Sequence, residues 1–211
     1  KALQNYRINY GPKHPLTSAG YEALAAHHLE HTDPALALDF AQLALIAVTT
    51  DFHDRDIFSN PPMEHSLHDL TLLKGLSTKT RALEKLAKRM EDTVEDRIKT
   101  LQAALETNRL SIDLLHHLRK SYPVRESRIF LTKEQKGLFS TGIRLNIRLF
   151  DLTHHDAFRE AAFLVASAGK SFEMLYEMKQ KELLYLKTLP DSLASVILDL
   201  KKQTGYYSSL I

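Results

Sequence analysis

The stretch "ALALDFAQLAL", from Ala35 to Leu45, decides the fold. Within it Ala37, Ala41 and Ala44 are separated by four and then three residues, so they share one face of a helix. The side chains at a helix contact set the distance between the two axes, and small ones allow a close approach. The stretch therefore predicts a helix that packs closely against a neighbouring helix.

The same spacing of small residues recurs twice further along the chain. The second copy is Ala104, Asn108 and Ser111, and the third is Ala162, Ala166 and Gly169. In each copy an apolar residue follows the first member, namely Leu38, Leu105 and Phe163. Each copy falls on the second helix of a predicted helical hairpin, and repeated hairpins stack into a solenoid. We therefore predict an all-α right-handed superhelix of antiparallel helical hairpins.

Turn and cap residues place the first hairpin. The segment "GPKHP", Gly11 to Pro15, predicts a turn, and Thr17 or Ser18 is the expected N-cap of a helix that runs to about His31. Asp33 is the expected N-cap of the next helix, with Pro34 at its first position.

The remaining breakers divide the rest of the chain into a long loop and further helices. The polar stretch 49–66 predicts the loop, and loops of this length are often functional. Turns are expected at 91–96, 121–127 and 153–156. The helices expected between these breaks are 67–90, 97–122, 132–152 and 157–188, with a last helix at 191–207.

The composition excludes several functional classes. The 211 residues include 28 Lys or Arg and 26 Asp or Glu, and a formal net charge of +2 does not indicate nucleic-acid binding. No apolar run approaches the ~18 residues of a membrane helix, so no membrane partner is expected. The absence of cysteine excludes disulfides and thiolate catalysis. The absence of cysteine is compatible with the cytoplasmic location that we expect. The chain begins inside a helical pattern, so we interpret it as a piece of a longer protein.

Three short motifs could carry chemistry, and each has a simpler explanation. "AGKS", Ala168 to Ser171, matches the end of a phosphate-binding loop but lies in a helical pattern without the first glycine. His27 and His31 have the spacing of helical zinc ligands, without an evident third ligand. The acidic loop Asp51–Asp56 lacks the central glycine of a calcium loop. We therefore predict no catalytic residue, no metal and no cofactor, and interpret the chain as not an enzyme.

A longer stretch carries a family resemblance. "YGPKHPLTSAGYEALAAHHLEHTDPALALDFAQLALIAV", Tyr10 to Val48, resembles a tetratricopeptide repeat of the kinesin-light-chain-like type, in which a Gly-x-x-His-Pro turn precedes the hairpin. Its signature packing positions are matched by Tyr21, Leu24, Ala25, Ala37, Ala41 and Ala44. His28 stands where a tyrosine is usual, and Ala41 where an aromatic residue is usual.

The following segment is similar to a more specific group. "ALIAVTTDFHDRDIFSNPP", Ala44 to Pro62, resembles the repeat region of bacterial proteins that end in a CHAT domain, a caspase-like protease module. The segments 101–122, 162–175 and 189–207 also resemble that region. The resemblance implies a tetratricopeptide-like repeat domain at 1–188, and a terminal helix at 189–211 that leads towards a downstream protease domain.

These observations together predict a scaffold for protein–protein interaction, with a protein or peptide as partner. In the larger protein it would be the sensing or regulatory arm, and its own downstream protease domain is a second candidate partner. The first helix of each hairpin lines the groove of such a solenoid, so Glu22, Ala26 and Leu29 are the candidate groove residues. The alternatives are a helical ligand- or metal-binding domain with a site at a histidine pair or in the 51–66 loop, and a structural spacer or oligomerisation module.

Overall fold

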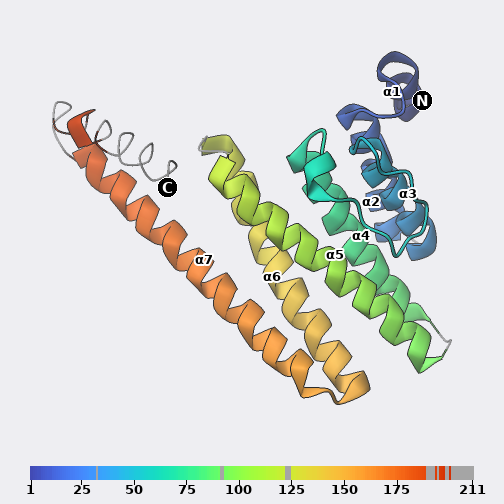
Figure 1. Ribbon diagram of the computed structural model, residues 1–211. Coiled ribbons are helices and arrows are strands. Elements are labelled where there is room, and N and C mark those ends of the chain that lie inside the picture. Colours follow the sequence, from blue (N-terminus) through green and yellow to red (C-terminus); the bar gives the residue numbers. More distant parts are fainter. Residues whose placement is uncertain are drawn as a thin grey trace. The chain divides into compact units, whose positions relative to one another are not determined.

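The computed structural model describes residues 1–31, 33–90, 93–121 and 125–188, together with residues 193, 195–197 and 200. Within these residues the chain is helical, with irregular segments between the helices (Figure 1). The helices are α1 (Ala2–Tyr10), α2 (Pro15–His31), α3 (Pro34–Ala47), the 3-10 helix η1 (Met63–His65), α4 (Asp69–Arg89), α5 (Val94–Ser121), α6 (Arg125–Thr153) and α7 (Asp156–Thr188).

The predicted all-α class is confirmed for the described residues. From α1 to α6 each helix packs against the next one along the chain, and α2 also packs against α4. The chain divides into two compact units, Lys1–Ala166 and Ser167–Ile211, so α7 belongs to both. The terminal helix predicted for 189–211 lies almost entirely outside the described residues.

The small-residue faces are buried in the first two copies. Ala37, Ala41 and Ala44 are all 0% exposed, as the close packing of α3 against α2 requires. The second copy, Ala104, Asn108 and Ser111 of α5, is also completely buried. The third copy differs, because only Ala162 is buried and the Phe163 side chain is 71% exposed.

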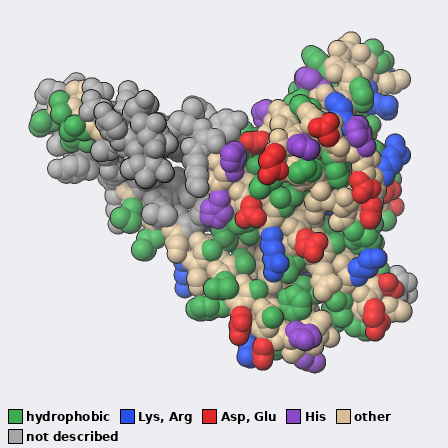
Figure 2. All heavy atoms as spheres, in the orientation of Figure 1, with side chains coloured by type: hydrophobic (Ala, Val, Ile, Leu, Met, Phe, Trp, Pro, Cys, Tyr) green, Lys and Arg blue, Asp and Glu red, His purple; other side chains and the backbone are tan. Residues whose placement is uncertain are grey.

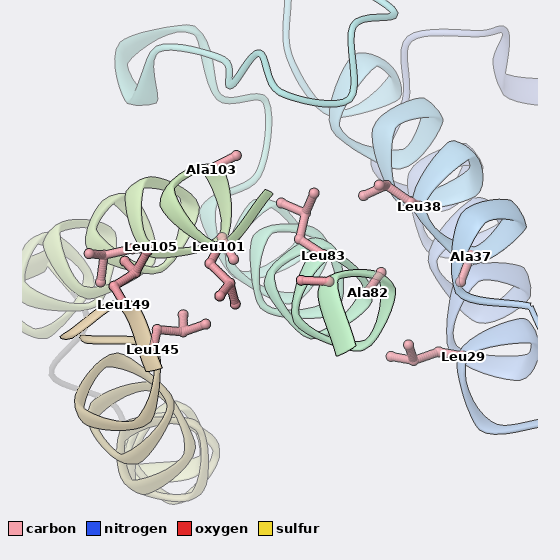
Figure 3. Close-up of a cluster of buried hydrophobic side chains, with 12 residues drawn as sticks. Leu29, Ala37, Leu38, Ala82, Leu83, Leu101, Ala103, Leu105, Leu145 and Leu149 are labelled. Atoms are coloured by element: carbon pink, nitrogen blue, oxygen red, sulfur yellow. The ribbon is translucent and has the colours of Figure 1, made fainter. Parts of the chain in front are cut away.

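One hydrophobic cluster extends through α2, α3, α4, α5 and α6 (Figure 3). In Figure 3, Leu29 of α2 points towards α4, and Leu83 of α4 lies between α3 and α5. Leu145 and Leu149 bring α6 into the same cluster, and both are completely buried. Burial of a leucine side chain contributes roughly 2 kcal/mol, so this cluster is a main source of stability for the five helices.

Two details of the first hairpin differ from expectation. Helix α2 begins at Pro15, ahead of Thr17 and Ser18, so neither residue is its N-cap. Both side chains are buried instead, and each hydroxyl donates a hydrogen bond. Thr17 Oγ1 donates to the Gly11 carbonyl at 2.8 Å, and Ser18 Oγ donates to the Ala44 carbonyl at 2.8 Å. The hydroxyls therefore fix α2 to the preceding turn and to α3.

The predicted cap of α3 is confirmed. Asp33 Oδ1 accepts hydrogen bonds from the backbone amides of Ala35 and Leu36, at 3.0 and 3.1 Å. Pro34 follows it at the first helical position. These contacts satisfy two of the amides that a helix start leaves without an intrahelical partner.

Substituting this cap gives the first expected result. The Asp33→Ala change should lower the free energy of unfolding by about 1 kcal/mol, because two amides of the first turn of α3 lose their acceptor. Urea unfolding followed by circular dichroism measures the change. Asp39→Ala is the matched control, since Asp39 is an exposed residue within the same helix. An equal loss in both variants would contradict a capping role.

Candidate functional site

The structure places the three predicted groove residues of α2 against or near α4. Glu22 is half-buried, and its Oε1 accepts a hydrogen bond from Thr78 Oγ1 at 3.0 Å. Leu29 is 2% exposed and belongs to the core cluster, so its side chain has almost no surface to offer a ligand. Ala26 is partly buried. Because α4 covers this part of α2, we next consider the exposed side of α4.

The exposed side of α4 is basic throughout. Within α4, which the structure describes completely, every exposed side chain is Lys or Arg: Lys74, Arg81, Lys85, Lys88 and Arg89. Three of them, together with the half-buried Ser77, follow one another at helical spacing. We call Ser77, Arg81, Lys85 and Lys88 the basic stripe.

A carboxylate shared by two arginines joins α4 to α6. Glu84 Oε1 accepts from Arg144 Nε at 2.6 Å and from Arg148 Nη1 at 2.7 Å, while Oε2 accepts from Arg144 Nη2 at 2.8 Å. The Glu84 side chain is 10% exposed, against 45% for Arg144 and 35% for Arg148. The hydrogen bonds that Arg144 donates to Glu84 raise the pKa of Arg144 above its usual value, so the guanidinium stays charged. Two cations on one carboxylate leave a net positive charge here.

A small pocket of about 210 Å³ lies beside this cluster, where α4, α5 and α6 meet. Its lining contains three hydroxyls, an amide, a guanidinium, a leucine and a glycine, from Ser77, Thr80, Arg81, Asn108, Gly137, Leu138 and Thr141. The Asn108 amide is fixed, because its Nδ2 donates to the Leu138 carbonyl at 3.2 Å. Its Oδ1 faces Gly142, where an added Cβ would come within 2.7 Å of that oxygen. Gly142 is therefore required for the close approach of α6 to α5.

A buried lysine lies on the side of α4 that faces α3 and the long loop. The Lys79 side chain is 0% exposed. Its ammonium donates to Gln42 Oε1 at 2.8 Å, to the Ser59 carbonyl at 2.5 Å and to Asn60 Oδ1 at 3.0 Å. The Gln42 amide continues the network to the Asp54 carbonyl at 2.9 Å, and Thr107 Oγ1 of α5 donates to Asn60 Oδ1 at 3.2 Å. One side chain thus connects α3, the 48–68 loop, α4 and α5.

This lysine should make stability depend on pH. Burial lowers the pKa of Lys79 from its usual 10.5 to about 7, although Asp56 and Asp54 act in the opposite direction. Between pH 7 and 10 the unfolded chain therefore keeps a proton that the folded chain has lost, so the free energy of unfolding rises with pH. The slope for one proton is at most about 1.4 kcal/mol per pH unit.

Urea unfolding at pH 7, 8 and 9 measures this slope. The Lys79→Met variant is the reference, because it retains the other titrating groups of the chain. We expect the unmodified chain to gain stability over the variant as the pH rises, by about 1 kcal/mol per unit. Parallel pH profiles for the two proteins would contradict the lowered pKa.

A second lysine, which the sequence analysis missed, closes the end of α3. Lys13 Nζ donates to the carbonyls of Ile46, Thr49 and Phe52, at 2.8, 2.9 and 2.6 Å. Burial lowers the pKa of Lys13, and the charge of Asp51 partly offsets this. Cations stabilise the C-terminal carbonyls of a helix, which explains a lysine here. The sequence signal for Lys13 was its position inside the predicted Gly11–Pro15 turn.

The three motifs weighed for chemistry share no residue with the basic stripe or with the lining of the pocket. The His27 and His31 rings are 4.7 Å apart, and the His28 ring stacks on Phe40 at 5.5 Å. Histidines lie at several separate places on the face shown in Figure 2. Among the described residues, no three or more His, Asp or Glu side chains gather as a metal would require.

The other two motifs have structural roles. Residues 168–171 of "AGKS" lie inside α7, where Ser171 Oγ donates to the Ser167 carbonyl at 3.1 Å. In the acidic loop, Asp54 Oδ1 accepts from the Asp56 amide at 2.8 Å, and Asp56 Oδ1 accepts from the Phe58 amide at 3.0 Å. These are local turns of the backbone. The local bond to the Asp56 amide is also the main cause that lowers the pKa of Asp54.

The basic stripe, the pocket and the Glu84 cluster offer hydrogen-bond donors and positive charge, which suits recognition of an anionic group. No helix in the described part of the chain has both the length and the apolar character needed to cross a bilayer. Comparison of the chain with family models, with curated proteins and with solved structures found no match in any of the three.

Proposed function

We propose that this chain is a non-catalytic protein-interaction module, built as a right-handed superhelix of tetratricopeptide-like helical hairpins. The observation that carries the proposal is the direct connection between alternate helices. Thr78 of α4 bonds to Glu22 of α2, and Glu84 of α4 bonds to Arg144 of α6. Stacked hairpins bring their first helices side by side in this way, and the resulting surface is where such arrays bind their partners.

The packing of the second helices supports the same proposal. The small-residue faces of α3 and α5 are buried, so this side of each helix contacts neighbouring helices and is not available to a partner. The exposed side chains of α4, a first helix, are all basic. In the larger bacterial protein that the CHAT resemblance implies, the module would act as the regulatory arm of a caspase-like protease domain.

A selection from a displayed library of random linear peptides tests the proposal. We expect enriched peptides to bind the purified chain, and to slow amide hydrogen exchange on α2, α4 and α6 more than on α3 and α5. The control is the same selection against the Gly142→Val variant, in which the added side chain would collide with Asn108 and disturb the packing of α5 and α6. Failure to enrich any peptide, or protection confined to α3 and α5, would overturn the proposal.

A further inference from the structure

We propose that the basic stripe of α4 binds an extended acidic peptide segment, with one carboxylate entering the pocket beside Arg81. This inference rests on the proposed function and names the chemical class of the partner. Three observations support it. The pocket contains hydrogen-bond donors without partners, the neighbouring Glu84 is already bound by two arginines, and the cations along α4 have a suitable spacing.

The pocket has donors that the fold does not use. Among the described residues, none forms a hydrogen bond or ion pair with the Arg81 guanidinium or the Ser77 hydroxyl. Thr141 Oγ1 accepts from Arg144 Nη2 at 3.1 Å, so its own proton remains available. Thr80 is different, because its hydroxyl donates to the Leu76 carbonyl at 2.9 Å. A carboxylate accepts several hydrogen bonds and donates none, and so matches the donors of Arg81, Ser77 and Thr141, although it offers no donor to the unpaired Asn108 Oδ1.

Among the side chains that the structure describes, no acidic one lines the pocket. Glu84, one helical turn beyond Thr80, is already bound by the two arginines of α6 and is 10% exposed. An incoming carboxylate would therefore meet positive charge, and the apolar wall at Leu138 suits the aliphatic part of a glutamate side chain.

The spacing of the stripe fits an extended peptide. Along a helix axis, the four residues from Arg81 to Lys85 advance about 6 Å, and the three from Lys85 to Lys88 advance about 4.5 Å. Alternate residues of an extended chain, which point to the same side, are about 6.6 Å apart. Acidic residues at alternate positions can therefore face Arg81 and Lys85 together. Lys85 Nζ donates once to the Leu29 carbonyl at 2.7 Å, which leaves two of its protons for a partner.

The observations favour a peptide over a nucleic acid. Nucleic-acid binding draws its affinity from many phosphates at once and is typical of strongly basic domains. This chain has a formal net charge of +2, and its unused donors converge on one small pocket. A pocket that holds one carboxylate, next to a short basic stripe, suits a short acidic peptide segment.

Fluorescence anisotropy with a labelled seven-residue peptide of alternating Glu and Ser tests the inference, at ~150 mM salt. The Gln–Ser peptide of the same length is the neutral probe, and a single-stranded oligonucleotide of matched charge is the nucleic-acid probe. We expect the acidic peptide to bind at least tenfold more tightly than either. Arg81→Glu should weaken this binding at least tenfold. Arg109→Glu makes the same charge change at an exposed position of α5 and should weaken binding less than threefold.

Thr141→Val separates the pocket from general charge attraction. It removes the pocket hydroxyl without changing net charge, and we expect a loss of about threefold to tenfold in affinity for the acidic peptide. Equal weakening by Arg81→Glu and Arg109→Glu, or tighter binding of the oligonucleotide, would overturn the inference. If the library selection enriches only neutral peptides that protect α2, α4 and α6, the proposed function stands and the acidic partner is wrong.

Discussion

Replacing Lys79 with methionine is expected to lower the free energy of unfolding by about 3 kcal/mol at pH 7. Methionine fills a similar volume but donates no hydrogen bond. Gln42 Oε1 and Asn60 Oδ1 then lose a donor, as does the Ser59 carbonyl. Each buried acceptor left without a donor lowers the free energy of unfolding by about 1–3 kcal/mol. Part of this loss is offset, because the variant no longer buries an amine.

The same substitution should free the 48–68 loop before the helices unfold. Limited trypsin digestion reports this locally, because Arg55 is exposed in the middle of the loop. We expect cleavage there to accelerate at least tenfold in Lys79→Met, and to change little in the control Lys88→Met, an exposed lysine of the same helix. Loss of global stability without faster cleavage in the loop would show that Lys79 supports the helices alone.

The second large effect is expected from Glu84→Ala, which should lower the free energy of unfolding by about 2 kcal/mol. The change leaves Arg144 and Arg148 side by side without the carboxylate they share. Removing one partner of a fully buried pair costs about 3–5 kcal/mol, and partial exposure of both arginines reduces this. Denaturant unfolding measures the loss, with Glu106→Ala as the control at an exposed position of α5.

A double-mutant cycle identifies the source of that loss. If the shared carboxylate is what joins α4 to α6, adding Arg144→Gln to Glu84→Ala should cost much less than Arg144→Gln alone. Strict additivity of the two changes would refute the coupling. High salt should affect it only weakly, because the Glu84 carboxylate is largely shielded from solvent.

Local rules predicted most of the helices, but they began α2 after a cap at Thr17 or Ser18 and α6 near residue 132, whereas these helices begin at Pro15 and Arg125. The all-α class follows from apolar residues at helical spacing, and the Asp33 cap follows from the preference for acidic side chains at a helix start. The small faces of α3 and α5 were predicted from spacing alone. The third copy is buried only in part, because Ala166 and Gly169 are partly exposed.

The candidate site could be predicted only in part. Groove residues were assigned to α2 by position in the hairpin, whereas the structure buries Leu29 in the core cluster and leaves only basic side chains exposed on α4. A signal for Lys79 was present: Leu72, Leu76, Lys79 and Leu83 recur at intervals of four, three and four, which places the lysine on the core face. Its acceptors lie up to 37 residues away, and no local pattern reveals such partners.

The contacts of α4 bear on how this chain could evolve or be engineered. In arrays of identical repeats, units can be duplicated, deleted or exchanged because each interface resembles the next. Here Thr78 of α4 hydrogen-bonds to α2, Lys79 to α3 and the loop after it, and Glu84 to α6. The three pairs of side chains are chemically different. A hairpin inserted on either side of α4 would separate groups that have no substitute elsewhere. We therefore expect the order of the helices next to α4 to tolerate change less well than its exposed positions do.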